Sequence, residues 1–167
     1  ACRERLNTLF HGESPQHVIF TLNTTDALNL AIRGLVRPAS AGRKDHVVTT
    51  WLDHNSVLRP LNELASRGEI EVTRVECDPQ TGLADPDDIR VALRPNTRLV
   101  AVVHGSNVTG TLQPIREIGR ICREFAVPFV VDAAQTLGHL PIDVQADMID
   151  LLAFPGHKGL LGPLGTG

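Results

Sequence analysis

Short apolar runs alternate along the chain with segments whose apolar residues recur at helical spacing. The runs predict strands and the spaced segments predict helices, because side chains repeat every two residues along a strand and about every 3.6 along a helix. Gly34 and Pro38 are expected to end the first of these helices. The predicted helices cover residues 24–35, 56–67, 86–93 and 114–126. The predicted strands cover residues 17–21, 45–50, 69–77, 98–104, 128–132 and 147–154.

The runs at 98–104 and 128–132 are apolar at almost every position. Strands of this kind belong to parallel sheets that are buried on both faces, and the helices between them supply the cover. We therefore predict one α/β domain over residues 1–167, with a three-layer αβα arrangement around a mainly parallel sheet. The chain contains no sequence repeat or low-complexity linker that would divide it.

The composition removes several classes of protein from consideration. Hydrophobic residues make up 42% of the chain and charged residues 21%, as in an ordinary globular protein. The formal net charge of −3 disfavours a nucleic-acid-binding protein, which would usually be basic. No apolar run approaches the roughly 20 residues that cross a bilayer, so no membrane segment is expected. The three cysteines show neither a disulfide framework nor a metal-binding spacing, and they favour a cytoplasmic location.

Polar residues that directly follow predicted strands are the candidates for chemistry, because ligands of such sheets bind beyond the carboxyl ends of the strands. Lys158 follows the last strand, and a desolvated lysine can form a Schiff base with an aldehyde. Asp132 ends an apolar strand, where a carboxylate needs a cationic partner or hydrogen-bond donors. Taken alone, each also has a structural explanation, as a solvated loop lysine and as an ordinary helix cap.

Other strand ends carry further candidates. Thr24 and Thr25 begin a helix, whose free N–H groups and positive dipole end suit a phosphate, although a plain helix cap has the same pattern. His54 could stack on an aromatic ligand or transfer protons, and Asn107 and Gln135 could contact ligand oxygens. Each of these is also explained as a loop or turn residue. The absence of a Walker lysine and of a G-x-G-x-x-G pattern favours a small phosphate ester over a nucleotide.

The set is more informative than its members. One edge of the sheet would present a phosphate site, an imidazole, two amides, a carboxylate for a ring nitrogen and a lysine for an aldehyde. This combination matches pyridoxal 5′-phosphate (PLP), for which a protein supplies binding, orientation and electronic tuning. We expect no metal site. An NAD-type domain is a weaker alternative, because no helix follows the glycines of residues 162–167.

Five motifs, in order and spacing, resemble the class V aminotransferase family, and most closely its cysteine desulfurases and selenocysteine lyase-like members. The resemblance extends over essentially the whole chain and implies the large domain of a fold-type I PLP enzyme. The motifs are Asn-Thr-Thr-Asp-Ala-Leu-Asn (23–29), Asp-His-Asn-Ser (53–56), Ser-Asn-Val-Thr-Gly-Thr (106–111), Val-Asp-Ala-Ala-Gln (131–135) and Pro-Gly-His-Lys-Gly-Leu-Leu-Gly-Pro (155–163).

The resemblance implies a role for each candidate. Lys158 is similar to the lysine that binds the cofactor aldehyde, and Asp132 to the partner of the pyridine nitrogen. Gln135 and Asn107 resemble contacts at the ring-oxygen edge. His54 resembles the imidazole stacked on the ring, which is also a candidate acid or base. The phosphate ligands that the resemblance implies are Thr24, Thr25 and His157.

One position departs from the family pattern. Many desulfurases have a serine two residues before the histidine of the lysine motif, whereas this chain has Pro155, which offers neither a hydroxyl nor an N–H. The family also places its sulfur-accepting cysteine and its substrate-binding arginine in a C-terminal part beyond these 167 residues. We therefore expect a fragment of the large domain, without the N-terminal segment and the C-terminal small domain, that is inactive by itself.

The function implied for the parent protein is PLP-dependent removal of sulfur from L-cysteine, which leaves alanine and a persulfide. Such family members are homodimers, and a sulfur-acceptor protein is a further expected partner. Two alternatives stay open. One is another reaction of the same site, as in an aminotransferase or a different PLP lyase. The other is a truncated domain that keeps the fold and binds no cofactor.

Overall fold

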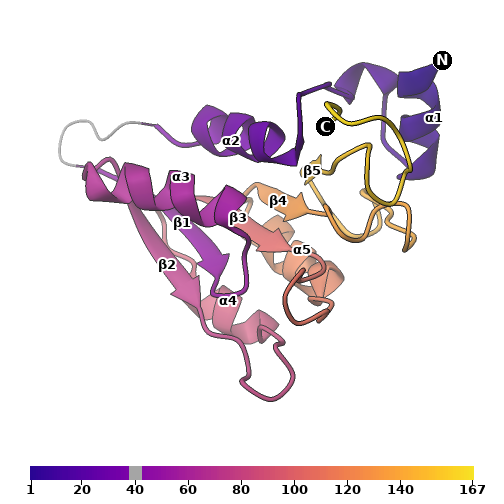
Figure 1. The fold of residues 1–167 in the computed structure, drawn as a ribbon. Helices are drawn as coiled ribbons and strands as arrows, with labels where there is room; N and C mark the ends of the chain where they lie inside the picture. The colour runs from indigo at the N-terminus through magenta and orange to yellow at the C-terminus, as the bar shows by residue number, and fades with distance from the viewer. Residues whose placement is uncertain (38–42) are drawn as a thin grey trace.

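The computed structural model describes residues 1–37 and 43–167, whose backbone forms one five-stranded sheet (Figure 1). The order across the sheet is β2-β1-β3-β4-β5, and every neighbouring pair is parallel. The predicted parallel sheet is therefore confirmed. The strands are β1 (Asp45–Thr50), β2 (Ile70–Val75), β3 (Thr97–Val103), β4 (Phe129–Asp132) and β5 (Leu151–Ala153).

Helices cover both faces of this sheet, as its apolar strands predict. One face carries α2 (Thr24–Leu35) and α3 (Asn55–Ser66), and the other carries α4 (Pro86–Ala92) and α5 (Ile115–Glu124) (Figure 1). Because side chains alternate along a strand, Val47 packs with the first pair of helices and Val48 with the second. These two buried layers establish the three-layer αβα architecture.

Local sequence signals explain where the helices begin. Asn23 caps α2 by accepting the N–H of Asp26 at 2.9 Å, and Asp85 caps α4 in the same way. α2 has the predicted bounds, with Gly34 inside its last turn, whereas Pro38 lies outside the described residues. None of the helices in residues 1–37 and 43–167 has the length and apolar character needed to cross a membrane.

The strand order reverses between β1 and β3. The chain moves outward from β1 to β2, then crosses back and continues through β3, β4 and β5. The loops that leave the carboxyl ends of β1 and β3 therefore diverge, and a crevice at such a point is the usual ligand site of an open α/β sheet. The fold thus directs attention to the edge where the candidate residues were expected.

The predicted strand over residues 17–21 is wrong. Pro15–His17 is a short 3-10 helix, and residues 18–21 are extended but lie outside the sheet. A strand needs a hydrogen-bonded neighbour along its length. In the part of the chain that the structure describes, strand-like pairing of this segment is limited to Thr21 and Gly167, whose backbones exchange hydrogen bonds of 2.7 and 2.9 Å.

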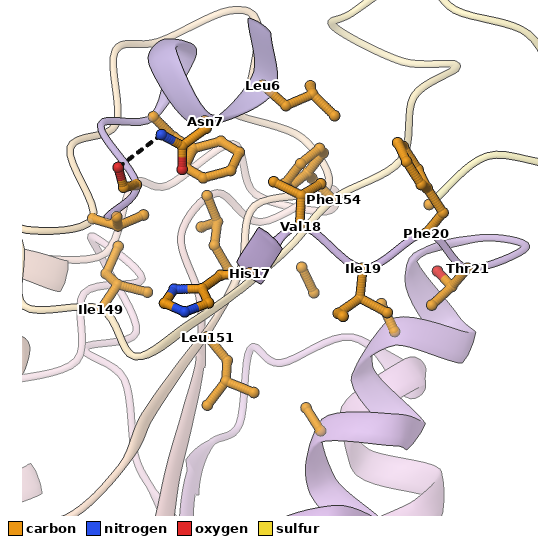
Figure 2. A pocket seen from close by; sticks show the side chains of 18 of the residues that line it. Leu6, Asn7, His17, Val18, Ile19, Phe20, Thr21, Ile149, Leu151 and Phe154 are labelled. Carbon is orange, nitrogen blue, oxygen red and sulfur yellow. Dashed lines mark hydrogen bonds between the residues drawn. The ribbon is translucent and has the colours of Figure 1, made fainter. Parts of the chain in front are cut away.

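An apolar groove of about 1100 Å³ lies between this segment and β5, and it explains why the segment is apolar. Figure 2 shows Val18, Ile19 and Phe20 around the groove, together with Ile149 and Leu151 from the region of β5. The groove is also bordered by α1 (Cys2–Leu9), a helix that we did not predict because its apolar positions are too few, and none of its residues is buried.

Candidate functional site

Asp132 is the buried centre of the candidate site. It is the last residue of β4 and is only 3% exposed. One carboxylate oxygen accepts the N–H of Ala134 at 2.9 Å, and the other has no hydrogen-bond partner among the described residues. Burial raises the pKa of Asp132, while the Ala134 N–H and the nearby basic side chains of His54 and Lys158 act to lower it. The free oxygen can therefore receive a cationic donor.

The chain after β4 makes a turn at residues 134–136. The alternative explanation of Asp132 as an ordinary helix cap is therefore wrong. Gln135 is half-buried in this turn. The hydroxyl oxygen of the next residue, Thr136, lies 3.0 Å from Nδ1 of His104, which follows β3. This contact joins the loop after β3 to the turn after β4.

Lys158 is half-buried in the loop after β5, and glycines allow this loop to pack directly against the chain after β4. A Cβ atom on Gly159 would lie 2.3 Å from the carbonyl oxygen of Leu137. One on Gly138, which has a φ of +89°, would lie 2.4 Å from the carbonyl carbon of Gly159. A side chain at either position would push the two segments apart. Their close approach keeps Lys158 near enough to Asp132 to affect its pKa.

His54 lies at the start of α3, in the loop that leaves β1. Its Nδ1 accepts the backbone N–H of Ser56 at 3.1 Å and lies 2.8 Å from the Ser56 hydroxyl. The imidazole is exposed, whereas Ser56 is buried. The histidine therefore caps the helix with one ring nitrogen, and the other nitrogen has no partner among the described residues.

Asp53 anchors the loop that carries His54. Its buried carboxylate accepts the N–H of Val103, at the end of β3, at 2.6 Å. It also accepts three hydrogen bonds of 2.7 to 2.8 Å from Thr49 and Thr50 of β1. Burial raises the pKa of Asp53 to about 6, although these hydrogen bonds act to lower it. The loop is thus fastened to the ends of two neighbouring strands.

The amino end of α2 offers hydrogen-bond donors that lack partners. The backbone N–H groups of Thr24 and Thr25 make no hydrogen bond within the described residues, and the helix dipole adds positive potential there. The Thr25 hydroxyl, in contrast, lies 2.8 Å from the Ser56 hydroxyl. Next to Lys158, the ring of His157 has a buried Nδ1 for which the described structure also supplies no partner.

Asn107 is the candidate that the structure connects least to the rest. It is exposed in the turn after β3, where the preceding Ser106 accepts the N–H groups of Val108 and Thr109. Within residues 1–37 and 43–167 it has no side-chain hydrogen bond to another candidate. By contrast, His54 and Lys158 lie near enough to Asp132 for their charges to lower its pKa.

Sequence reasoning assigned no role to Asp53 or Ser56, although both belong to the Asp-His-Asn-Ser motif. A signal for Ser56 was present, because a polar residue at a helix start commonly accepts the backbone N–H two positions later. Here the polar residue is His54, and the N–H is that of Ser56. Thr49 and Thr50 are near Asp53 in the sequence, but its partner Val103 is 50 residues away, so no local pattern indicates that the loop is fastened to β3.

The unpartnered groups of this edge fit PLP. The free oxygen of Asp132 can accept a protonated pyridine nitrogen, and Lys158 can hold an aldehyde. The N–H groups at the start of α2 and the unpartnered nitrogen of His157 can contact a phosphate. Within the described ranges, no group of three His, Cys, Asp or Glu side chains is placed to hold a metal ion.

The chain belongs to the class-V aminotransferase family, whose model matches residues 1–167. Two curated relatives carry the name cysteine desulfurase IscS. The one from Anaeromyxobacter dehalogenans is 41% identical over 167 residues, which cover 100% of this chain and 40% of the relative. The one from Dictyoglomus turgidum is 38% identical over 156 residues, which cover 93% of this chain and 39% of the relative. The chain thus spans about 40% of the length of these relatives.

Solved structures agree with this family and with the predicted fold class. The structure described as SspA in complex with cysteine is 36% identical, with a TM-score of 0.89 over 99% of this chain and 46% of that one. The Escherichia coli cysteine desulfurase CsdA is 28% identical, with a TM-score of 0.88 over 100% of this chain and 41% of that one. The predicted resemblance is therefore confirmed.

Proposed function

We propose that the carboxyl end of this sheet is a PLP site and that the whole protein is a cysteine desulfurase-like enzyme. The observation that carries the proposal is that Asp132 at the end of β4, His54 at the start of α3 and Lys158 after β5 follow the carboxyl ends of strands of one sheet. The two basic side chains lie near enough to Asp132 to lower its pKa. A buried carboxylate with one free oxygen, beside two basic groups, suits a protonated pyridine ring that carries an aldehyde. The dependence of this family on PLP in general supports the same conclusion.

Bound PLP would supply an electron sink for negative charge that develops at the α-carbon of an amino acid. Lys158 would hold the cofactor and move a proton at that carbon. Asp132 would keep the proton on the pyridine nitrogen, and His54 would cover the ring and exclude water from it. Gln135 and Asn107 would contact the ring oxygen. The phosphate would be held by the backbone at Thr24 and Thr25 and by His157.

L-Cysteine is the proposed substrate, with alanine and persulfide sulfur as products. The names of the relatives, and the cysteine bound to SspA, support this choice. Since the chain spans about 40% of those relatives, we propose that the sulfur-accepting cysteine lies outside these residues. A homodimer, a sulfur-acceptor protein and a cytoplasmic location are further parts of the proposal.

The whole polypeptide that contains these residues, loaded with PLP, provides the test. It is supplied with L-cysteine and a thiol reductant, and alanine and sulfide are measured. We expect equal amounts of both, lost in Lys158→Ala and retained in Lys44→Ala. A keto acid without sulfide would identify an aminotransferase instead. Absence of every product would contradict the proposed enzyme.

A further inference from the structure

Ser56 lies between two residues that the proposed function places at the cofactor, and it is only 8% exposed. Its hydroxyl oxygen is 2.8 Å from the Thr25 hydroxyl and 2.8 Å from Nδ1 of His54. Its backbone N–H donates to the same Nδ1 at 3.1 Å. A continuous line of hydrogen bonds therefore runs from the start of α2, through Ser56, to the imidazole.

The direction of each hydrogen bond in this line follows from the backbone donor. An amide N–H can only donate, so Nδ1 of His54 must present a lone pair and carry no hydrogen. A neutral imidazole then carries its hydrogen on Nε2. The Ser56 hydroxyl, which faces the same lone pair, must donate as well. Its own oxygen is left to accept the hydroxyl hydrogen of Thr25.

We propose that Ser56 is a positioning residue that holds His54 as the Nε2–H tautomer, with the Thr25 hydroxyl orienting Ser56. The tautomer of a histidine is set by the hydrogen bond that the other ring nitrogen makes, and here both donors of Ser56 serve that purpose. The tautomer stands on these contacts alone. Only its use in catalysis rests on the proposed function.

Two consequences follow for the site. Nε2 of His54 carries a hydrogen and is free to donate it to a ligand, because no described residue pairs with Nε2. In this neutral form Nε2 has no lone pair, so it can donate a hydrogen bond to a ligand but cannot accept a proton there. The Thr25 hydroxyl hydrogen is committed to Ser56, so Thr25 would bind a phosphate through its backbone N–H.

Nitrogen NMR of the uniformly labelled chain tests the tautomer without any cofactor. At a pH well above the ordinary histidine pKa of about 6.5, the two ring nitrogens of a fixed tautomer give separate unprotonated and protonated shifts. We expect Nδ1 of His54 to be unprotonated, and a coupling across the hydrogen bond to link it to the Ser56 amide nitrogen. His54→Gln identifies the signals among the seven histidines.

Variants of Ser56 separate the contribution of its hydroxyl to the tautomer of His54 from that of its backbone N–H. Ser56→Ala removes the hydroxyl and keeps the backbone donor, so both His54 ring signals should move part of the way toward the average of the two tautomers. Ser56→Thr keeps a hydroxyl and should give the wild-type values. Thr25→Val should give a smaller shift in the same direction as Ser56→Ala. Ser66→Ala, at the far end of α3, is the matched control and should change nothing. A protonated Nδ1 in the wild type, or unchanged signals in Ser56→Ala, would overturn the proposal. Because no cofactor is needed, failure of the proposed function leaves this result readable.

Discussion

The two ends of the sheet differ in whether buried polar atoms have hydrogen-bond partners. At the amino end of β1, His46 is fully buried and both ring nitrogens are paired, Nδ1 with Thr97 at 2.9 Å and Nε2 with Thr73 at 2.8 Å. At the carboxyl end, Nδ1 of His157 is buried without a partner among the described residues, and the second carboxylate oxygen of Asp132 accepts no hydrogen bond from them.

Among the described residues Oδ1 of Asn7 and Nε of Arg74 are also buried without a partner, so one unpaired atom does not indicate a ligand by itself. At the carboxyl end, unpaired groups on several elements lie at the ligand edge of the sheet.

The two lysines of the chain follow the same division. Lys44 is exposed and directly precedes β1 at the amino end of the sheet. Lys158 is half-buried beyond the carboxyl end of β5, close to Asp132. Position within the sheet therefore distinguishes an exposed lysine from a half-buried one whose charge lies near a buried carboxylate.

The largest effect that we expect concerns stability in acid, and it arises at the amino end. Burial first, and then the charge of Arg94, lower the pKa of His46 from 6.5 to about 4. The unfolded chain therefore takes up a proton at this position before the folded chain does. As the pH falls from 6.5 to about 4, His46 should cost up to roughly 3 kcal/mol of folding stability.

Urea unfolding at several pH values checks this expectation. The comparison is between the wild type and His46→Gln, which cannot titrate there. The stability advantage of the wild type should shrink as the pH falls through this range, because the contributions of all other groups cancel. Parallel stability curves for the two proteins would show that His46 is not buried in its neutral form.

The next effect concerns cofactor affinity at the carboxyl end. Asp132→Asn keeps an acceptor for the N–H of Ala134 and removes the charge that faces the ligand. A hydrogen bond to a charged group contributes about 1.5–3 kcal/mol, so PLP should bind roughly tenfold to a hundredfold more weakly. Folding stability should not fall, because burial disfavours the carboxylate in the free protein.

A carboxylate at the opposite end of the same strand serves as the matched control. Asp150 accepts the N–H of Phe129, the first residue of β4, at 2.8 Å. Asp150→Asn should leave PLP affinity unchanged in a fluorescence titration. Equal losses of affinity in the two variants would remove the distinction between the two ends of the sheet.

The smallest effect tests whether hydrogen-bond partners, rather than position at the carboxyl end of the sheet, decide whether a buried aspartate stabilises the fold or binds a ligand. Asp53 lies at the carboxyl end, yet its carboxylate has four hydrogen-bond donors. Asp53→Asn introduces an amide group that faces donors, and it should cost about 1–2 kcal/mol of folding stability at neutral pH. Chemical denaturation measures this cost. A variant as stable as the wild type would mean that unpaired groups are not what separates Asp132 from Asp53.

The buried parallel strands could be predicted because burial on both faces requires apolar residues at nearly every position, as in β3 and β4. The same property misled us at residues 17–21. An extended segment beside an apolar groove has the composition of a strand, and only the presence of a neighbouring strand distinguishes the two.

The candidate site could be predicted only in part, for a similar reason. Asp132 and Lys158 follow strands, so their positions alone direct them to the ligand edge of the sheet. The partners of Ser56 and Asp53 depend on which loops meet in space. Thr25 and Ser56 are 31 residues apart, and Asp53 and Val103 are 50 residues apart. No local pattern in the sequence contains that information.

Chemical trapping at the two lysines tests most directly whether the carboxyl end of the sheet is a PLP site. The purified chain is incubated with PLP, reduced with borohydride and digested, and the modified peptide is located by mass spectrometry. We expect the pyridoxyl group on the peptide that contains Lys158, and its loss in Lys158→Ala but not in Lys44→Ala. Equal labelling of Lys44 and Lys158, or labelling of neither, would contradict a PLP site at this end of the sheet.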